Sequence, residues 1–205
     1  MIRNSIWKYT LDCHSEIKSD LLKFIDDYKQ INPNPYKNDC IFKTDFYDKT
    51  RKFNIGEYNG NNKENYYYMY PEYFEFFKEK LGPLWNKICH KYWLTNINIA
   101  GAWFQQYKDN GYHGWHLHGG SNISISYLLE LDDMKYSTEF VDTERKDSFQ
   151  LKCQEGDVII FPSYIIHRSP LIRSDTRKTI IAANVDFINV DLIKINSIDP
   201  ILNYE

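Results

Sequence analysis

The chain has 205 residues, a formal net charge of −3, 42% hydrophobic residues and 26% charged residues. This length suits one domain with a full core and is short for two. The weak negative charge argues against a dedicated nucleic-acid binder, because contacts to phosphate supply most of the affinity of such proteins. No apolar run reaches membrane-spanning length and the N-terminus lacks a signal-peptide pattern, so we expect a cytoplasmic protein without a membrane partner.

The four cysteines are scattered and form no C-x-x-C pair, which is typical of a reducing compartment. Frequent Asn, Lys, Ile and Tyr hint at an AT-rich genome, viral or bacterial. The oligomeric state cannot be derived from these features.

The first 95 residues carry mainly helical patterns. Ser15 is a candidate N-cap, and it is followed at helical spacing by the apolar residues Ile17, Leu21, Leu22, Ile25 and Tyr28. The Asn32–Pro35 segment should end this helix, because proline cannot continue it. Residues 36–68 are polar and rich in turn formers, so we expect loops there that shape specificity.

Pro71 suits the first turn of a second helix, and Gly82-Pro83 should kink or split that helix. Its expected buried stripe consists of Phe74, Phe77, Leu81, Leu84, Trp85 and Ile88.

From Ile97 onward the hydrophobic period changes to two, which indicates strands. The predicted strands are 97–107, 122–130, 138–142, 148–153, 157–161, 164–170 and 178–187. Many short strands preceded by helices predict a mainly β protein with N-terminal helices, whose core is a jelly roll, or double-stranded β-helix. We therefore expect a single domain over 1–205, with helical support in 1–95, a β core in 96–190 and a C-terminal tail in 191–205.

Three of the six histidines fall within six residues, at His113, His116 and His118. Residues two apart on a strand share a face, so an extended segment would point His116 and His118 the same way. His167 lies on another predicted strand and is the candidate third ligand. Neutral imidazole is the commonest metal ligand near neutral pH, so this set predicts a metal site.

Several motifs accompany these histidines. Ser121–Leu128 is like a serine-rich "SGvyYL" strand, Gln154–Ser163 is like "eGdlviFPs", and Arg177–Asn184 is like "R-x-S-i-x-x-N". With Tyr107, Gly111 and the histidines, their order resembles the catalytic core of the 2-oxoglutarate- and Fe(II)-dependent oxygenases over about residues 97–187. The resemblance is to a branch common in phages and marine bacteria, and next to the prolyl-hydroxylase-like branch.

The sequence departs from this family at one position. Most members use His-x-Asp or His-x-Glu to complete a two-His-one-carboxylate triad, whereas here His118 follows His116. Three interpretations are open: a three-His site, a different frame that uses His113, or a carboxylate from elsewhere, such as Asp142 or Glu139. We favour the three-His site.

The resemblance also implies a cation that binds the far carboxylate of 2-oxoglutarate. Arg177 lies at the family's offset from His167, and guanidinium suits a carboxylate because it is always charged and binds in bidentate fashion. Arg168 and Arg173 are nearer competitors. Further hydrogen bonds to the cosubstrate are assigned to Tyr127, Ser124 and Asn184, among which period-two reasoning does not choose.

The function that the resemblance implies is hydroxylation of a protein side chain, an amino acid or a small metabolite. It would use O2 and 2-oxoglutarate and release succinate and CO2. Two alternatives come from other classes: a three-His dioxygenase of the cupin type that needs no 2-oxoacid, and a non-catalytic jelly roll that binds a sugar or peptide. The sequence does not identify the substrate.

Overall fold

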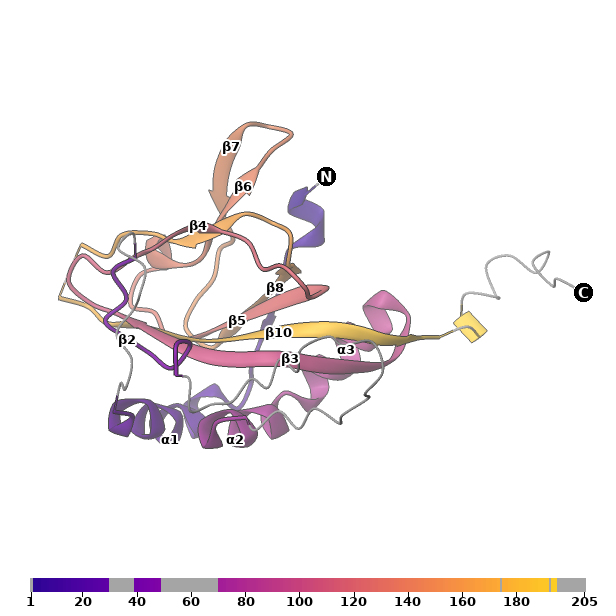
Figure 1. The fold of residues 1–205 in the computed structure, drawn as a ribbon, viewed down its shortest axis with the longest axis horizontal. Helices are drawn as coiled ribbons and strands as arrows, with labels where there is room; N and C mark the ends of the chain where they lie inside the picture. Colours follow the sequence, from indigo (N-terminus) through magenta and orange to yellow (C-terminus); the bar gives the residue numbers. More distant parts are fainter. Residues whose placement is uncertain (1, 30–38, 49–69, 174, 192, 195–205) are drawn as a thin grey trace, which may run out of the picture.

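The structure is a computed structural model, and it describes the chain apart from residues 1, 30–38, 49–69, 174, 192 and 195–205. Two antiparallel sheets face each other, and three helices lie against the far side of the larger sheet (Figure 1). The larger sheet has six strands in the order β1 (Trp7–Thr10), β8 (Asp157–Pro162), β5 (Ile123–Glu130), β10 (Lys178–Val190), β3 (Leu94–Tyr107) and β2 (Lys43–Thr44). The smaller sheet has four, in the order β4 (His113–His116), β9 (His167–Ser169), β6 (Glu139–Asp142) and β7 (Asp147–Gln150).

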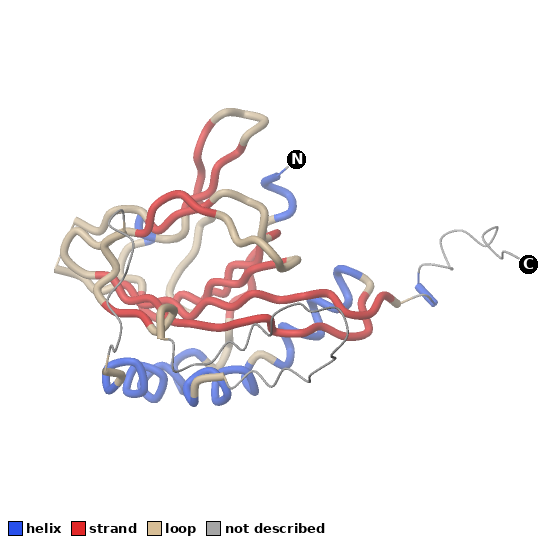
Figure 2. Tube along the Cα trace, viewed as in Figure 1, coloured by secondary structure: helices blue, strands red, loops and turns tan. Residues whose placement is uncertain are grey.

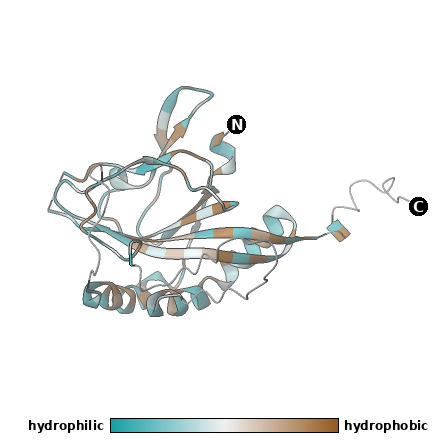
Figure 3. Cartoon of the chain, viewed as in Figure 1, coloured by the Kyte–Doolittle hydropathy of each residue, from teal (hydrophilic) through white to brown (hydrophobic). Residues whose placement is uncertain are grey.

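The helices are α1 (His14–Asp27), α2 (Glu72–Lys80) and α3 (Gly82–Tyr92), with short 3-10 turns η1 (Ile2–Ser5) and η2 (Met134–Tyr136) (Figure 2). None of the helices in the described ranges is long and apolar enough to cross a membrane. Hydrophobic and hydrophilic residues alternate along helices and strands, as Figure 3 shows. On the helices this alternation lets one side be buried, whereas the central strands β5 and β8 are buried along nearly their whole length.

The larger sheet is buried on both faces, and the two faces carry residues of opposite parity. One core joins the helices to its outer face, through residues that include Leu21, Phe74, Phe104, Tyr127 and Ile181. A second core fills the space between the sheets, through residues that include Leu128, Phe140, Phe161 and Ile180. A shift of one residue along a strand therefore moves a side chain from the helical side to the space between the sheets.

Most of the predicted elements from residue 71 onward are present. Pro71 caps α2, and the predicted split at Gly82-Pro83 is confirmed, because α2 ends at Lys80 and α3 begins at Gly82. The stripe on these helices is buried except for Trp85, which is partly exposed. The observed β7 and β9 are shorter than the predicted strands.

The N-terminal region differs from the sequence prediction in two ways. The prediction that Ser15 caps the first helix is wrong: α1 begins at His14 with Cys13 as N-cap, and the His14 ring lies in the first turn, bonded to Tyr127 and Glu155. The region is also not purely helical, because β1 pairs with β8 and β2 pairs with β3. The predicted helix end at Asn32–Pro35 lies outside the described residues.

Candidate metal and cosubstrate site

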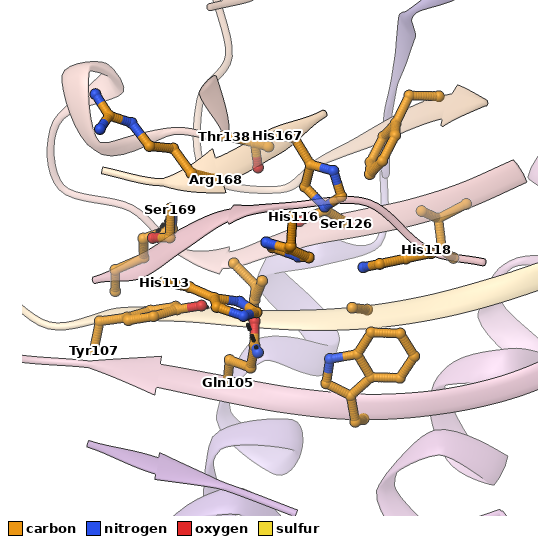
Figure 4. Close-up of a pocket in the computed structure, with 16 residues that line it drawn as sticks. Gln105, Tyr107, His113, His116, His118, Ser126, Thr138, His167, Arg168 and Ser169 are labelled. Atoms are coloured by element: carbon orange, nitrogen blue, oxygen red, sulfur yellow. Dashed lines mark hydrogen bonds between the residues drawn. The ribbon is translucent and has the colours of Figure 1, made fainter. Parts of the chain in front are cut away.

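Three histidines from two neighbouring segments of the smaller sheet converge. His116 is the last residue of β4 and is paired in register with His167 of β9. His118 lies two residues past the end of β4, where its backbone N–H donates to the Ser163 carbonyl at 2.9 Å. One ring nitrogen from each histidine lies within 4.8 Å of the others (Figure 4). The structure thus brings together the three residues that the sequence predicts as metal ligands.

The hydrogen bonds of the three rings fix their tautomers. The Nδ1 atom of His116 donates to the Gly114 carbonyl at 2.8 Å, and that of His167 donates to the Ile165 carbonyl at 3.0 Å. His118 Nδ1 lies 2.8 Å from both Ser124 Oγ and Asn184 Oδ1. Carbonyl oxygens only accept, so each Nδ1 carries the proton and each Nε2 keeps its lone pair. Partners of this kind typically orient metal-binding histidines.

Burial also favours the neutral form of these rings. It lowers the pKa of His118 to about 4, with the neighbouring His116 adding to the effect. Desolvation likewise lowers the pKa of His116 and, strongly, that of His167. Three neutral imidazoles with unshared lone pairs fit a borderline divalent metal such as Fe(II). The residues present therefore fit a metal ion held by imidazole alone.

The carboxylates considered as ligands are engaged elsewhere. Asp142 pairs with Arg3 at 2.8 Å, and Glu139 pairs with Arg168 at 2.6 Å. Neither is in the ligand group that the described residues form. His113 is not in that group either, but its ring stacks on His116 with centroids 3.9 Å apart. Of the three interpretations, the geometry favours the three-His site.

A pocket lies between the sheets, with the histidines on one wall. The larger sheet contributes side chains of one parity from β3 and β10: Trp103, Gln105 and Tyr107, and Lys178, Ile180 and Ala182. Ser126, Ser169, Thr138, Phe161, Ile125, Arg168 and His113 complete the lining. No carboxylate is among these lining residues.

Lys178 is the buried cation of this pocket, being 2% exposed. Its Nζ donates to Ser169 Oγ at 2.8 Å and lies 5.3 Å from the centre of the Tyr107 ring. Burial lowers the pKa of Lys178 to about 7. A buried ammonium with no acidic partner in the pocket lining is well placed to receive an anion.

The structure places Arg177 elsewhere. Its guanidinium pairs with Asp26 at 2.9 Å and Glu130 at 2.7 Å, and it does not line the pocket. Arg177 precedes β10. The next residue, Lys178, begins that strand and is its first residue to face the pocket. Arg168 lines the mouth, but its guanidinium lies over the exposed ring of Trp115, directed away from the histidines (Figure 4). Arg173 is also absent from the lining.

The three other predicted cosubstrate residues divide by parity. Ser124 and Asn184 bond to each other at 2.9 Å and hold His118, so they act on the histidine and are not part of the pocket lining. Tyr127 lies on the opposite face, where its hydroxyl is 2.6 Å from His14 Nδ1 and its ring stacks on Phe77.

The sequence prediction did not single out Lys178, Gln105 or Ser126, all of which line the pocket. The hydroxyl of Tyr107 donates to Gln105 Oε1 at 2.7 Å, and the Gln105 amide lies 3.3 Å from His113 Nδ1. A signal for Lys178 is present in the sequence, because it shares parity with Asn184 on a strand whose period is two. Ser126 shares parity with Ser124 on its strand in the same way, whereas no predicted cosubstrate or metal residue lies on the strand of Gln105.

No family model matches the sequence, and neither does any curated protein. Among solved structures, the viral collagen prolyl hydroxylase vCPH from Paramecium Bursaria Chlorella virus-1, in its 2OG complex, is similar with a TM-score of 0.55 and 13% identity. That match covers 90% of this chain and 97% of the other.

Two Streptomyces proteins are similar as well. AviO1 from Streptomyces viridochromogenes Tue57 matches with a TM-score of 0.59 and 10% identity over 91% of both chains. HygX from Streptomyces hygroscopicus, with nickel and 2-oxoglutarate bound, matches with a TM-score of 0.56 and 7% identity, over 89% of this chain and 82% of that one. The chain has the fold of the 2-oxoglutarate- and Fe(II)-dependent oxygenases. The resemblance predicted from the motifs is thus confirmed at the level of the fold, with prolyl hydroxylases among the neighbours.

Proposed function

We propose that this protein is an Fe(II)- and 2-oxoglutarate-dependent oxygenase with a double-stranded β-helix core, acting as a hydroxylase in the cytoplasm. One observation carries the proposal: three neutral imidazoles and one buried ammonium line the same pocket between the sheets. A metal site alone would not need the ammonium, and a binding module for sugars would need neither. The substrate is a protein side chain, an amino acid or a small metabolite.

His116, His118 and His167 would hold the metal through their Nε2 atoms. Fe(II) bound there supplies the activation of O2 that is coupled to decarboxylation of 2-oxoglutarate to succinate and CO2. An imidazole in place of a carboxylate leaves the site one unit more positive, which strengthens its attraction for a dianionic cosubstrate. The fixed Nδ1 partners keep the three rings in place before any metal binds.

Lys178 would bind the far carboxylate of 2-oxoglutarate, in the role that the sequence analysis gives to Arg177. On β10, Lys178 lies two inward-facing positions away from Ala182. This spacing leaves part of the pocket between Lys178 and the histidines. The Ser169 hydroxyl and the Tyr107 ring lie beside the ammonium and complete this end of the pocket. The dicarboxylate would thus span from the histidines to Lys178.

The deciding experiment is an anaerobic titration of the Fe(II)-loaded protein with 2-oxoglutarate, followed by the visible charge-transfer band. The wild type should develop the band and, in air, form succinate. Lys178→Met should raise the Kd for 2-oxoglutarate by roughly 30-fold or more, because it removes a buried charge partner. Arg177→Met is the matched control and should change the Kd by less than about threefold, because its ion pairs are partly exposed. Absence of the band in the wild type would refute the proposed function.

A further inference from the structure

Two buried side-chain oxygens in the described part of the chain lack a hydrogen-bond partner: Ser126 Oγ and Ser137 Oγ. A buried hydroxyl without a partner costs about 1–3 kcal/mol, so each needs an explanation. The two residues differ in location. Ser126 is 5% exposed and lines the pocket, whereas Ser137 is fully buried and does not line it.

Strand pairing fixes the place of Ser126 on the pocket floor. It pairs with Ile159 of β8 and with Ala182 of β10, which in turn pairs with Trp103 of β3. The next inward pair along these strands is Ser124 with Asn184, which holds His118. Ser126 is therefore one inward position from the pair that holds His118, and Figure 4 labels it beside His116.

The Lys178 end of the pocket is farther along the same face. Lys178 and Ala182 are four residues apart on β10, a separation of about 13 Å between Cα positions at the usual rise of a strand. The Lys178 side chain extends into the pocket, so the distance from its ammonium to the Ala182 end is shorter than this Cα separation. Ser126 and Lys178 thus stand at opposite ends of the space that a dicarboxylate would occupy.

The small side chains of Ser126 and Ala182 leave space in the pocket next to the histidines. Ser126 and Ala182 sit side by side in the sheet, while the larger Trp103 and Ile159 flank them in the same row. An apolar residue would fill the space without leaving an unsatisfied hydroxyl. A hydroxyl beside the histidines instead offers a donor toward whatever lies there.

We propose that the Ser126 hydroxyl binds the cosubstrate, donating a hydrogen bond to the oxoacid end of 2-oxoglutarate. The inference rests on the proposed function and adds a residue to it. Carboxylate and keto oxygens only accept, so a hydroxyl with a free proton complements them, and a bond to the charged group is the stronger kind. Lys178 binds the far carboxylate in the proposed function, so Ser126 would bind the oxoacid end, next to the histidines.

The test compares Ser126→Ala with Ser137→Ala, since both changes remove a buried hydroxyl without a partner. The titration of the Fe(II)-loaded protein gives the Kd for 2-oxoglutarate, and thermal unfolding of the metal-free protein gives the Tm. Ser126→Ala should raise the Kd roughly tenfold. Ser137→Ala should leave it within twofold of the wild type. Neither change should lower the Tm, because neither removes a hydrogen bond within the protein.

Each other outcome counts against the inference. A Kd within twofold of the wild type for Ser126→Ala would mean that the cosubstrate does not use this hydroxyl. A lower Tm for Ser126→Ala would mean that the hydroxyl has a partner within the protein. If the wild type itself fails to bind 2-oxoglutarate, the proposed function and this inference fall together, whereas normal binding with an unaffected variant overturns this inference alone.

Discussion

Hydrogen bonds at Nδ1 decide which nitrogen each of the three histidines could present to a metal. His118 is held by side chains, Ser124 and Asn184, whereas the partners of His116 and His167 are backbone carbonyls. The hydrogen-bond partners of His118 can therefore be mutated without changing any of the three histidines. This makes Asn184 the residue that tests whether the ring must be oriented beforehand.

Asn184→Ala should weaken Fe(II) binding by roughly tenfold, the low end of the effect usual for such outer partners. Ser124 retains one hydrogen bond to His118, so the loss should be smaller than that caused by His118→Ala. Competition with a chelator under anaerobic conditions gives both affinities. Equal metal affinity in Asn184→Ala and the wild type would show that Ser124 alone orients the ring.

The low pKa of Lys178 predicts how 2-oxoglutarate binding depends on pH. In the free protein the pKa is about 7, so the ammonium is lost as pH rises above that value. Binding of the dianion needs the charged form, so the affinity should fall with rising pH between 7 and 9, by at most about tenfold per unit. Below pH 7 the affinity should level off, because the pKa of His118 is only about 4. Titrations of the Fe(II)-loaded protein between pH 6 and 9 measure this.

Lys178→Arg is the control for this dependence, because guanidinium stays charged over the whole range. The variant should bind 2-oxoglutarate with little change between pH 7 and 9. If the wild type also showed no change there, Lys178 would not be the titrating group.

At the scale of elements, strand parity shows which parts of the site were predictable. Ser124 and Tyr127 are three residues apart and Arg177 and Asn184 are seven apart, so neither pair can share a face of a regular strand. The convergence of His116, His118 and His167 was predictable because their spacing and motif agree. Gln105 was not, since its role depends on tertiary contacts with Tyr107 and His113 that no local pattern encodes.

The same reasoning separates the predictable strands from the others. From residue 97 onward, the long predicted strands correspond to β3, β5, β8 and β10, which are neighbours in the larger sheet. The helices bury one face of these strands, and the core between the sheets buries the other. β1 and β2 are only four and two residues long and lie at the edges of the larger sheet. Strands this short are set by the edge that receives them and not by their own pattern.

The hydrogen bond between Tyr127 and His14 should stabilise the contact between β5 and α1. Its hydroxyl and the His14 ring join the first turn of α1 to the sheet, and the Glu155 carboxylate lies 3.1 Å from the other ring nitrogen. Tyr127→Phe should lower the free energy of unfolding by about 1–2 kcal/mol, since it leaves a ring nitrogen of His14 without its partner. Urea denaturation of the metal-free protein measures the loss. The Kd for 2-oxoglutarate should stay unchanged, and a higher Kd would place Tyr127 in the cosubstrate site after all.

At the scale of the whole molecule, the two sheets differ in how they are supported. The larger sheet packs against helices on one face and the smaller sheet on the other. The smaller sheet consists of strands of three or four residues. It also supplies His116 and His167, two of the three proposed metal ligands, while His118 is hydrogen-bonded to the larger sheet. A bound metal would therefore join the less supported sheet to the better supported one.

This arrangement predicts where metal binding stabilises the molecule. Saturating Fe(II), at about 1,000 times its Kd, should stabilise the folded protein by about 4 kcal/mol and raise the Tm. Hydrogen exchange under anaerobic conditions should slow most at residues 113–118 and 165–169, and least at the surface of α1 and α2, because only the former carry or adjoin ligands. His167→Ala should abolish both effects while its metal-free protein stays folded. Equal protection of the helices and the smaller sheet, or an undiminished rise in the Tm of His167→Ala, would show that the metal binds somewhere other than between these histidines.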